Sequence, residues 1–383
     1  MKLLHLRLEK FRNHTITQIA CSPLGNIFAG NNGEGKTNTL EAIAYLCLTK
    51  SFYAANDGVV TQIGETTFTL GGTFESDRGT SFHVTVQYDK NSGKKVLSVD
   101  KQPIEHSMEI IGKFPVVVLS PEQSGITMGT PQERRKFVDL AVSQTNRTYL
   151  EHLMEYRRIV KQRNRLLVQA RESGASEERA LAPWNESMAA AGSVIMRKRK
   201  EFLVEFSSVV REAYADLAGP EECPEVRYEP TFPMQDNGAS AGLEREFLRA
   251  IAGRRGIEQK IGFSLVGPHR DEVEFRLNGL PLRQYASQGQ HKTFLVALKM
   301  AEFRYLQDHC NETPMLLLDD VFSELDPERS AKLLGTAEKT GQTFITMTDP
   351  KAAHRALSEN ERWKTFRVHH GTIDHGEPAE TLR

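Results

Sequence analysis

Hydrophobic and polar residues follow two different periods along this chain, and the change of period divides it into parts. Residues 1–8 alternate as a half-buried β-strand does, and a short apolar run at residues 24–29 predicts a second strand. Between residues 132 and 171 no proline or glycine occurs, and apolar side chains recur at the three- and four-residue spacing of a helix. Strand-like patterning returns at residues 275–279. The pattern predicts an α/β protein with a helical segment inserted between two strand-containing parts.

The ends of the inserted segment carry separate helix signals. Thr130-Pro131-Gln132-Glu133 is a capping box with proline at the first helical position. Residues 173–176 are typical of a turn, and the predicted return helix covers residues 184–217, just after Pro183. We therefore expect a short antiparallel coiled coil. The predicted domains are residues 1–125, a first lobe; residues 126–225, the helical arm; and residues 226–383, a second lobe.

Composition indicates an ordinary globular protein. The chain has 383 residues, of which 26% are charged and 39% hydrophobic, and its formal net charge is −1. That balance neither favours nor excludes nucleic acid as a partner. No apolar run approaches the roughly 18 residues of a membrane span, and the N-terminus lacks the apolar core of a signal peptide. We expect a cytoplasmic protein with no membrane partner and with reduced, structural cysteines.

One stretch between a predicted strand and a predicted helix carries candidate chemistry. Residues 30–37 fill every fixed position of the phosphate-binding pattern G-x-x-x-x-G-K-[ST]. The glycines allow consecutive backbone N–H groups to face a phosphate, and the helix start adds partial positive charge. Lys36 is placed to reach the outer phosphates, and the Thr37 hydroxyl is placed to ligate Mg²⁺. We predict a nucleoside triphosphate site formed by Gly30, Asn31, Asn32, Gly33, Glu34, Gly35, Lys36 and Thr37.

A second motif lies far downstream. Residues 315–318 form an apolar run that ends in Asp319-Asp320, as expected of a buried parallel strand whose carboxyl end meets a ligand. Asp319 is placed to hold Mg²⁺, and Asp320 is placed to orient or deprotonate an attacking water. Alone this signal is weak. Beside a complete phosphate-binding loop it predicts a catalytic site that uses ATP and Mg²⁺.

The third motif is Ser287-Gln288-Gly289-Gln290, which opens a segment of helical spacing. Taken alone it indicates an N-cap. The motif follows a long insertion and precedes the acidic strand. This order, with the phosphate-binding loop first, is similar to the order of motifs in ABC-type ATPases. In those proteins the signature of one subunit completes the nucleotide site of another. The loop that contains Asp326 resembles the segment that lies across the dimer seam, and Thr348-Asp349 stands where a histidine is usual.

Motifs along nearly the whole chain resemble the bacterial RecF family, and they occur in family order. The stretch Gly267-Pro268-His269-Arg270-Asp271 is more specific to RecF than to ABC-type ATPases in general. Departures from the family pattern occur at Tyr53, Gln123-Ser124 and Glu272. The other matching stretches are residues 6–13, 30–38, 50–52, 120–122, 131–139, 285–290 and 317–326.

This resemblance implies an ABC-type ATPase head of two lobes with an inserted helical arm. It implies Arg12 and Asn38 as further nucleotide contacts, and residues 287–290 with Asp326 as contacts in trans. The implied function is a DNA-binding ATPase of recombinational repair, which dimerises with ATP at single-strand gaps or junctions and promotes recombinase loading. Slow, DNA-dependent hydrolysis would release the dimer. The implied partners are DNA, a second copy of the chain, RecR and RecO.

Basic residues gather in two runs within the predicted arm. Such runs are often a solvated helix face, but in a chain of balanced charge two facing runs form a stripe able to neutralise phosphates. With the resemblance, DNA contact becomes the preferred interpretation, and we expect recognition of backbone and junction shape because the sequence offers no base-reading motif. The predicted DNA-binding residues are Arg157, Arg158, Lys161, Arg163, Arg165, Arg197, Lys198 and Arg199.

Three alternatives remain open from the sequence. A small-molecule P-loop kinase would use the same loop but would not need the motif that begins at Ser287. An ABC-transporter subunit would need a membrane partner. A binder that does not hydrolyse ATP is also compatible, since Asp320 stands where fast ABC-type ATPases have glutamate. ATP-dependent dimerisation and its response to gapped DNA separate these classes.

Overall fold

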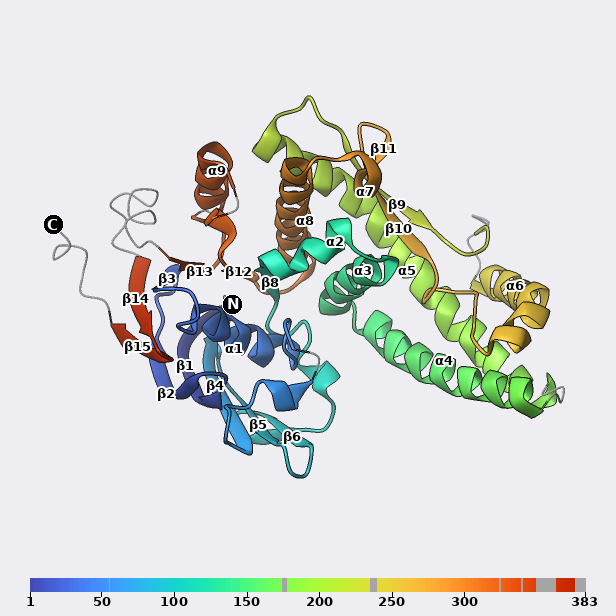
Figure 1. Cartoon of the computed structure of the whole chain (residues 1–383), viewed down its shortest axis with the longest axis horizontal. Coiled ribbons are helices and arrows are strands. Elements are labelled where there is room, and N and C mark those ends of the chain that lie inside the picture. Colours follow the sequence, from blue (N-terminus) through green and yellow to red (C-terminus); the bar gives the residue numbers. More distant parts are fainter. Residues whose placement is uncertain are drawn as a thin grey trace. The chain divides into compact units, whose positions relative to one another are not determined.

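The chain packs into two compact units (Figure 1). Unit 1 comprises Met1–Ser124, Ala213–Glu221 and Lys292–Arg383, and unit 2 comprises Gly125–Glu212 and Glu222–His291. The predicted second lobe was expected to start at residue 226, but the segment up to residue 291 packs with the arm helices in unit 2. The computed structural model describes residues 1–54, 56–173, 178–234, 240–323, 325–338, 340–348 and 363–375.

Two sequence predictions fall outside the described residues. These are most of the predicted turn at 173–176 and the aspartate at position 349. Within the ranges that the structure describes, no helix is both long enough and apolar enough to cross a membrane.

The core of unit 1 is a six-stranded sheet in the order β15-β14-β3-β13-β12-β8. All neighbouring pairs are parallel except β14 with β15. Every residue of β3, β13, β12 and β8 is buried, as expected of a parallel sheet covered on both faces. The strands are β3 (Gly25–Ala29), β8 (Val116–Leu119), β12 (Met315–Leu318), β13 (Thr343–Met347), β14 (Trp363–His369) and β15 (Thr372–His375).

This sheet brings the first two sequence motifs to one edge. In the register of the ladder, Ala29 pairs with Met347, and Leu318 pairs with Ile345. Residues 30–35 follow β3 directly and Asp319-Asp320 follow β12, so both motifs leave the carboxyl edge of the sheet on either side of β13. This edge is where open α/β sheets bind ligands.

The second sheet of unit 1 is antiparallel, in the order β2-β1-β4-β5-β6-β7. Helix α1 (Lys36–Leu48) contacts strands of both sheets, and nearly all of its residues are buried. Residues 42–48 of this helix are apolar on every side, as expected of a helix in such a sandwiched position. The strands are β1 (Lys2–Phe11), β2 (His14–Ala20), β4 (Thr67–Glu75), β5 (Ser81–Asp89), β6 (Lys94–Val99) and β7 (Gln102–Ile104).

Unit 1 has further described helices besides α1. Helix α8 (Gln288–His309) starts in unit 2 and continues into unit 1. Helix α9 (Pro327–Ala337) starts with proline directly after its N-cap, Asp326. The single-turn 3₁₀ helices are η1 (Asp57–Val59), η2 (Ser107–Glu109), η3 (Pro121–Ser124) and η4 (Val321–Ser323).

The outgoing side of the arm is two helices, where the sequence predicted one. Helix α3 (Pro131–Thr145) has the predicted capping box, in which the Thr130 N–H donates to Glu133 Oε2 over 2.7 Å. Helix α4 (Arg147–Ser173) begins after a break at Asn146. Asn146 has extended backbone angles, and its Oδ1 accepts a hydrogen bond from the Tyr149 N–H over 2.8 Å. A residue type that favours N-caps thus starts a new helix inside an apparently continuous one.

The return helix α5 (Glu178–Ala218) begins before the predicted residue 184 and contains Pro183 near its start. Side-chain contacts show that α4 and α5 run antiparallel. Arg163 of α4 donates to Asn185 of α5 over 2.7 Å, whereas Arg199 of α5 donates to the Tyr149 hydroxyl of α4 over 3.1 Å. The inserted antiparallel helical arm predicted from the sequence is therefore confirmed.

Unit 2 contains one further long helix, a small sheet and two short helices among its described residues. Helix α6 (Ser240–Ile261) contacts α4. A small antiparallel sheet has the order β11-β10-β9. The remaining bounds are β9 (Pro224–Glu229), β10 (Glu272–Leu277), β11 (Leu280–Pro281), α2 (Gly125–Met128) and α7 (Leu282–Tyr285).

Candidate nucleotide-binding site

The loop between β3 and α1 has two glycines in the backbone conformation that favours this residue type. Gly33 and Gly35 have φ of 84° and 111°, in the left-handed region. A Cβ at Gly35 would also lie 2.6 Å from Asn13 Oδ1. The loop leads directly into the N-terminus of α1 at Lys36, so backbone N–H groups and the helix dipole face the same space. The predicted loop geometry is therefore present.

Lys36 folds back over this loop. Its Nζ donates to the carbonyl oxygens of Gly30 and Asn31 over 2.7 and 2.8 Å. Burial lowers the pKa of the Lys36 amine, and the neighbouring carboxylates oppose this shift, Asp320 most strongly. The amine thus faces a pocket lined by Asn32, Gly33, Gly35, Lys36, Thr37, Asn38, Asp320 and Thr346.

Thr37 and Asp319 meet beside this pocket, although 282 positions separate them in the chain. The Thr37 hydroxyl donates to Asp319 Oδ1 over 2.8 Å, and the Thr346 hydroxyl donates to the same oxygen over 2.8 Å. Burial raises the pKa of Asp319, and the two hydroxyl donors act against that shift. A hydroxyl and a carboxylate are hard oxygen donors, so the pair fits Mg²⁺.

Thr346 is a site residue that the sequence analysis missed. Its hydroxyl also accepts the backbone N–H of Asp320 over 2.8 Å, so it holds both carboxylate positions of the acidic motif. The available signal was a polar residue in the buried strand β13, which neighbours β12. Asp320 itself has φ of 47°, a left-handed conformation that is strained for a non-glycine residue and recurs at functional sites.

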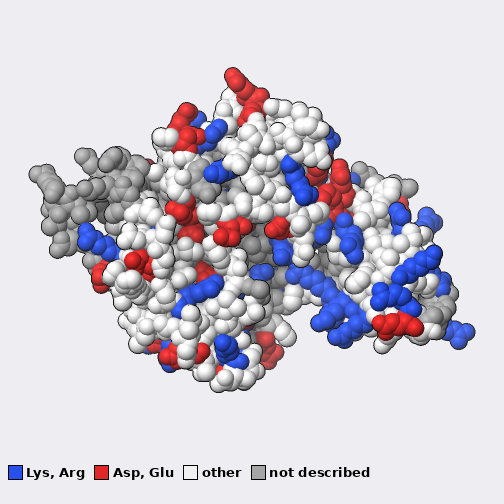
Figure 2. Space-filling view, in the orientation of Figure 1, with Lys and Arg blue, Asp and Glu red and all other residues white. Residues whose placement is uncertain are grey.

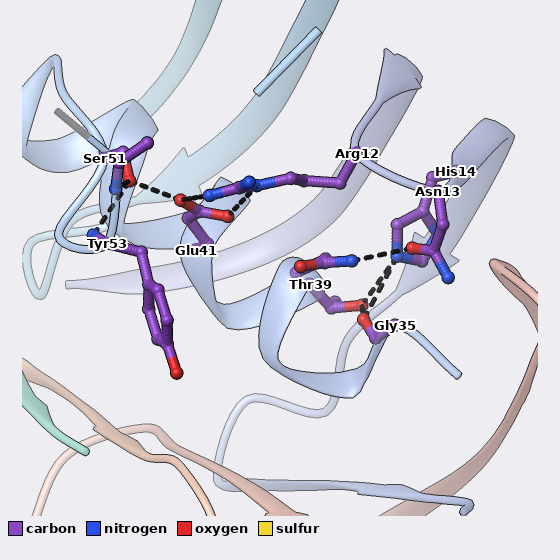
Figure 3. A network of polar contacts seen from close by, with 10 residues as sticks. Arg12, Asn13, His14, Gly35, Thr39, Glu41, Ser51 and Tyr53 are labelled. Atoms are coloured by element: carbon purple, nitrogen blue, oxygen red, sulfur yellow. Dashed lines mark hydrogen bonds and ion pairs between the residues drawn. The ribbon is translucent and has the colours of Figure 1, made fainter. Parts of the chain in front are cut away.

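Arg12, predicted as a nucleotide contact, is held by an ion pair with Glu41 of α1 (Figure 3). The guanidinium donates to both Glu41 oxygens over 2.7 Å each, a bidentate geometry. Ser51 donates to Glu41 as well, and the Ser51 hydroxyl accepts the Tyr53 N–H over 2.8 Å. The network ties the end of β1 to α1 and to the segment after it. Arg12 is not among the residues that line the pocket.

Asn13, in the turn after β1, and His14, at the start of β2, hydrogen-bond to the phosphate-binding loop and the start of α1 (Figure 3). Asn13 Nδ2 donates to the Glu34 carbonyl over 2.9 Å, and Asn38 Nδ2 donates to Asn13 Oδ1 over 2.8 Å. His14 is fully buried with its Nε2 3.2 Å from the Gly35 carbonyl, and burial lowers the pKa of His14. Asn13 and His14 therefore position the loop. Asn13 closes the matching stretch of residues 6–13 and His14 follows it, and neither was among the predicted site residues.

The third motif forms the N-terminus of α8, within unit 2. The Ser287 hydroxyl accepts the Gln290 N–H over 3.2 Å, and Gln290 Oε1 accepts the Ser287 N–H over 2.9 Å. This reciprocal pair is a capping box, so the N-cap interpretation holds. The first three residues of the motif, Ser287 to Gly289, are exposed. Asp326, in unit 1, caps α9 by accepting the Arg329 N–H over 2.9 Å.

Two of the predicted DNA-binding residues are in the interior of unit 2, and the prediction was wrong for them. Arg163 donates to Asn185, to Ser264 and to the fully buried Glu258. Arg199 pairs with Asp139 over 2.7 Å and donates to the Pro268 carbonyl over 2.6 Å. Each of the two arginine side chains is 2% exposed. Buried arginines with matched acceptors are structural, so neither is available to a phosphate.

The other six predicted residues lie at or near the surface. Figure 2 shows basic side chains gathered over α4. Arg158, Lys161 and Arg165 are exposed at helical spacing on α4. Arg157 is exposed and pairs with Asp139 over 3.2 Å, while Arg197 and Lys198 of α5 both reach Glu201. The exposed α4 residues are therefore the stronger remaining candidates for phosphate contacts.

Comparisons with known proteins agree with this architecture. The family model described as RecF/RecN/SMC N terminal domain matches residues 2–374. The chain is 40% identical over 354 residues to the DNA replication and repair protein RecF of Chloroherpeton thalassium, covering 92% of this chain and 96% of the relative. The chain belongs to the RecF family.

Solved structures support the same RecF-family fold. A structure of the recombination mediator protein RecF-ATP in the RecFOR pathway superposes with a TM-score of 0.90 at 28% identity, covering 98% of each chain. An SMC head bound to the C-winged helix domain of ScpA superposes with a TM-score of 0.56 at 13% identity, which indicates a shared fold alone. The predicted ABC-type head with an inserted arm is thereby confirmed.

Proposed function

We propose that this protein is a DNA-repair ATPase in which ATP binding joins two copies of the chain on DNA. The observation that carries the proposal is the hydrogen bond from Thr37 to Asp319 beside the Lys36 loop. It brings a P-loop hydroxyl and an acidic-strand carboxylate to hydrogen-bonding distance, as a site for Mg²⁺ and a nucleoside triphosphate requires. The RecF structure with ATP supports the choice of nucleotide.

Nucleotide binding follows from groups already aimed at the pocket. The loop N–H groups and the start of α1 would bind the phosphates, and Lys36 would exchange two neutral carbonyl acceptors for charged oxygens. Thr37 and Asp319 would hold Mg²⁺, which neutralises phosphate charge when it is bound. Asp320 lines the same pocket and is the proposed base or orienting group for the attacking water.

A second copy of the chain would complete this site. Ser287, Gln288 and Gly289 are exposed at the start of α8, where the helix dipole favours an anion. We propose that they contact the nucleotide held by the other copy, with Asp326 and its loop at the same seam. The ATP-bound state would then be the dimer. Slow hydrolysis would return the protein to monomers, because ADP lacks the phosphate that both copies share.

DNA is the proposed partner of the dimer. Exposed arginine and lysine side chains on α4 would contact backbone phosphates at single-strand gaps or junctions. Family membership supports RecR and RecO as further partners and recombinase loading as the outcome. We propose that the protein acts in the cytoplasm, where a bacterial protein meets its DNA partner. A small-molecule kinase is disfavoured by the exposed Ser287 motif, which such an enzyme does not need.

Separate roles for the two aspartates provide the test. Asp320→Asn should bind ATP normally but block turnover, so the ATP dimer should accumulate and stay on gapped DNA longer than the wild type. Asp319→Asn should weaken Mg²⁺-dependent ATP binding about tenfold, because a charged ligand is lost. Sedimentation with ATP and DNA-release rates measure both effects. Faster release of Asp320→Asn from DNA than of the wild type would contradict hydrolysis-driven release.

A further inference from the structure

Three metal-ligand side chains meet at one point on the phosphate-binding loop, and none of them is among the residues that line its pocket. Glu34 comes from the loop, and His369 and His370 come from the end of β14 and the turn that follows. One ligand atom from each of the three lies within 4.8 Å of the other two. Glu34 does not line the nucleotide pocket. The proposed nucleotide chemistry uses the backbone of the loop and gives no role to the Glu34 carboxylate or to the two imidazoles.

The spacing of the ligand atoms matches a shared ion. Glu34 Oε2 lies 3.4 Å from His369 Nδ1 and 3.3 Å from His370 Nδ1. Around a tetrahedral ion with bonds of about 2.0–2.2 Å, ligand atoms are separated by roughly 3.3–3.6 Å. The two distances from the carboxylate are thus already those of a tetrahedral site. Three protein ligands would leave a fourth position open.

The backbone is built to bring two consecutive histidines to the same side. Neighbouring residues of an extended strand point to opposite faces. His370 instead has φ of 47°, and the two imidazole centroids lie 4.2 Å apart. Left-handed conformation is uncommon for a histidine and is retained where the surroundings impose it. Here Gly371, with φ of 77°, donates its N–H to the Glu34 carbonyl over 2.9 Å and fixes the turn.

Accessibility and charge also suit an ion. The two imidazoles are 68% and 79% exposed, so an ion can enter, whereas the Glu34 side chain is only 10% exposed. A hydrogen bond from the His370 backbone N–H, together with the two imidazoles, lowers the pKa of Glu34. The carboxylate is therefore held in the ionised form that binds metals.

We propose that Glu34, His369 and His370 bind one divalent transition-metal ion of the zinc class. Two imidazoles and one carboxylate favour such an ion over Mg²⁺, which prefers oxygen ligands. The bound ion would cross-link the phosphate-binding loop to the β14–β15 hairpin. Nucleotide-loop geometry would then depend on metal supply, through a site distinct from the Thr37–Asp319 pair.

The test is calorimetric titration of the untagged full chain with zinc chloride, without nucleotide. The wild type should bind one zinc ion at this site. His369→Ala, His370→Asn and Glu34→Gln should each weaken binding at least about tenfold, since loss of an outer-shell partner alone costs 10–100-fold. Asparagine is chosen at position 370 because it tolerates left-handed backbone. Melting curves in chelator verify that each variant is folded.

Two controls separate this site from others. His83→Ala removes an exposed histidine elsewhere in unit 1, and Asp319→Asn removes the proposed Mg²⁺ ligand. Both should retain the wild-type zinc affinity of the site. Absence of zinc binding, or equal affinity in the wild type and the His370 variant, would overturn the proposal. Because the assay contains no nucleotide, its outcome is independent of whether ATP joins two chains.

Discussion

Lys36 in unit 1 and Arg199 in unit 2 are both nearly buried cations, yet their surroundings give them different uses. Arg199 is matched by the carboxylate of Asp139, and its remaining donors reach a hydroxyl and a carbonyl. Lys36 is held by two neutral carbonyls of its own loop and lines a pocket. A buried cation with a matched anion stabilises a fold, whereas one with neutral acceptors beside a pocket can exchange them for a ligand.

The largest effect should come from the structural cation. Arg199→Met should lower the free energy of unfolding by about 3–5 kcal/mol, because it leaves Asp139 buried without its main partner. The matched control is Arg157→Met, which removes an exposed partner of the same carboxylate. It should lower the free energy of unfolding by less than about 1 kcal/mol. Urea unfolding measures both. Equal losses would show that burial does not separate the two arginines.

Removing the ligand-facing cation should instead spare the fold. Lys36→Met should weaken ATP binding at least about 100-fold, or about 3 kcal/mol, because charge-assisted contacts to phosphate disappear. Its melting temperature should stay near that of the wild type. Lys90→Met, an exposed lysine of the same unit, is the control and should bind ATP normally. Wild-type ATP affinity in Lys36→Met would remove the basis of the assigned site.

The interior of unit 2 also predicts a pH dependence. Burial lowers the pKa of His269 to about 3, and its Nδ1 lies 2.7 Å from the Tyr156 hydroxyl. An unfolded histidine titrates near about 6.5, so between these values the unfolded chain binds the extra proton and stability falls as pH falls. From pH 7 to pH 5 the loss should be about 2 kcal/mol. Urea unfolding at both pH values measures this loss of stability, which should be smaller in His269→Gln than in the wild type. If the variant loses as much stability as the wild type, groups other than His269 cause the pH dependence.

The smallest effect concerns the surface cations. Arg158→Gln should weaken DNA binding by about 1 kcal/mol and lower the salt slope of log K by about 1, with stability unchanged. Gln169, one of the exposed positions further along α4, provides the control substitution Gln169→Ala. Fluorescence anisotropy on gapped DNA over a salt series measures the slope. An unchanged slope would move the DNA site away from α4.

The sequence predicted the parts of the molecule that depend on local pattern. The phosphate-binding loop, the acidic strand end and the arm follow from glycines, apolar runs and helical spacing, and the parallel sheet brings Thr37 and Asp319 together as expected. Charge runs were less informative, because nothing local indicates that Glu258 and Asp139 turn Arg163 and Arg199 inward. Thr346 was missed for the same reason, since its role depends on pairing between β12 and β13.

The central claim, that two chains share each nucleotide, is tested most directly by mixing two defective variants. Lys36→Met lacks its own phosphate contact but keeps the Ser287 motif, and Ser287→Arg has the reverse defect. Neither variant alone should dimerise with ATP, measured by energy transfer between labelled chains. Their mixture should form ATP-dependent heterodimers with one intact composite site. Dimerisation of Ser287→Arg alone at the wild-type level, or a mixture that stays monomeric with ATP, would contradict the account.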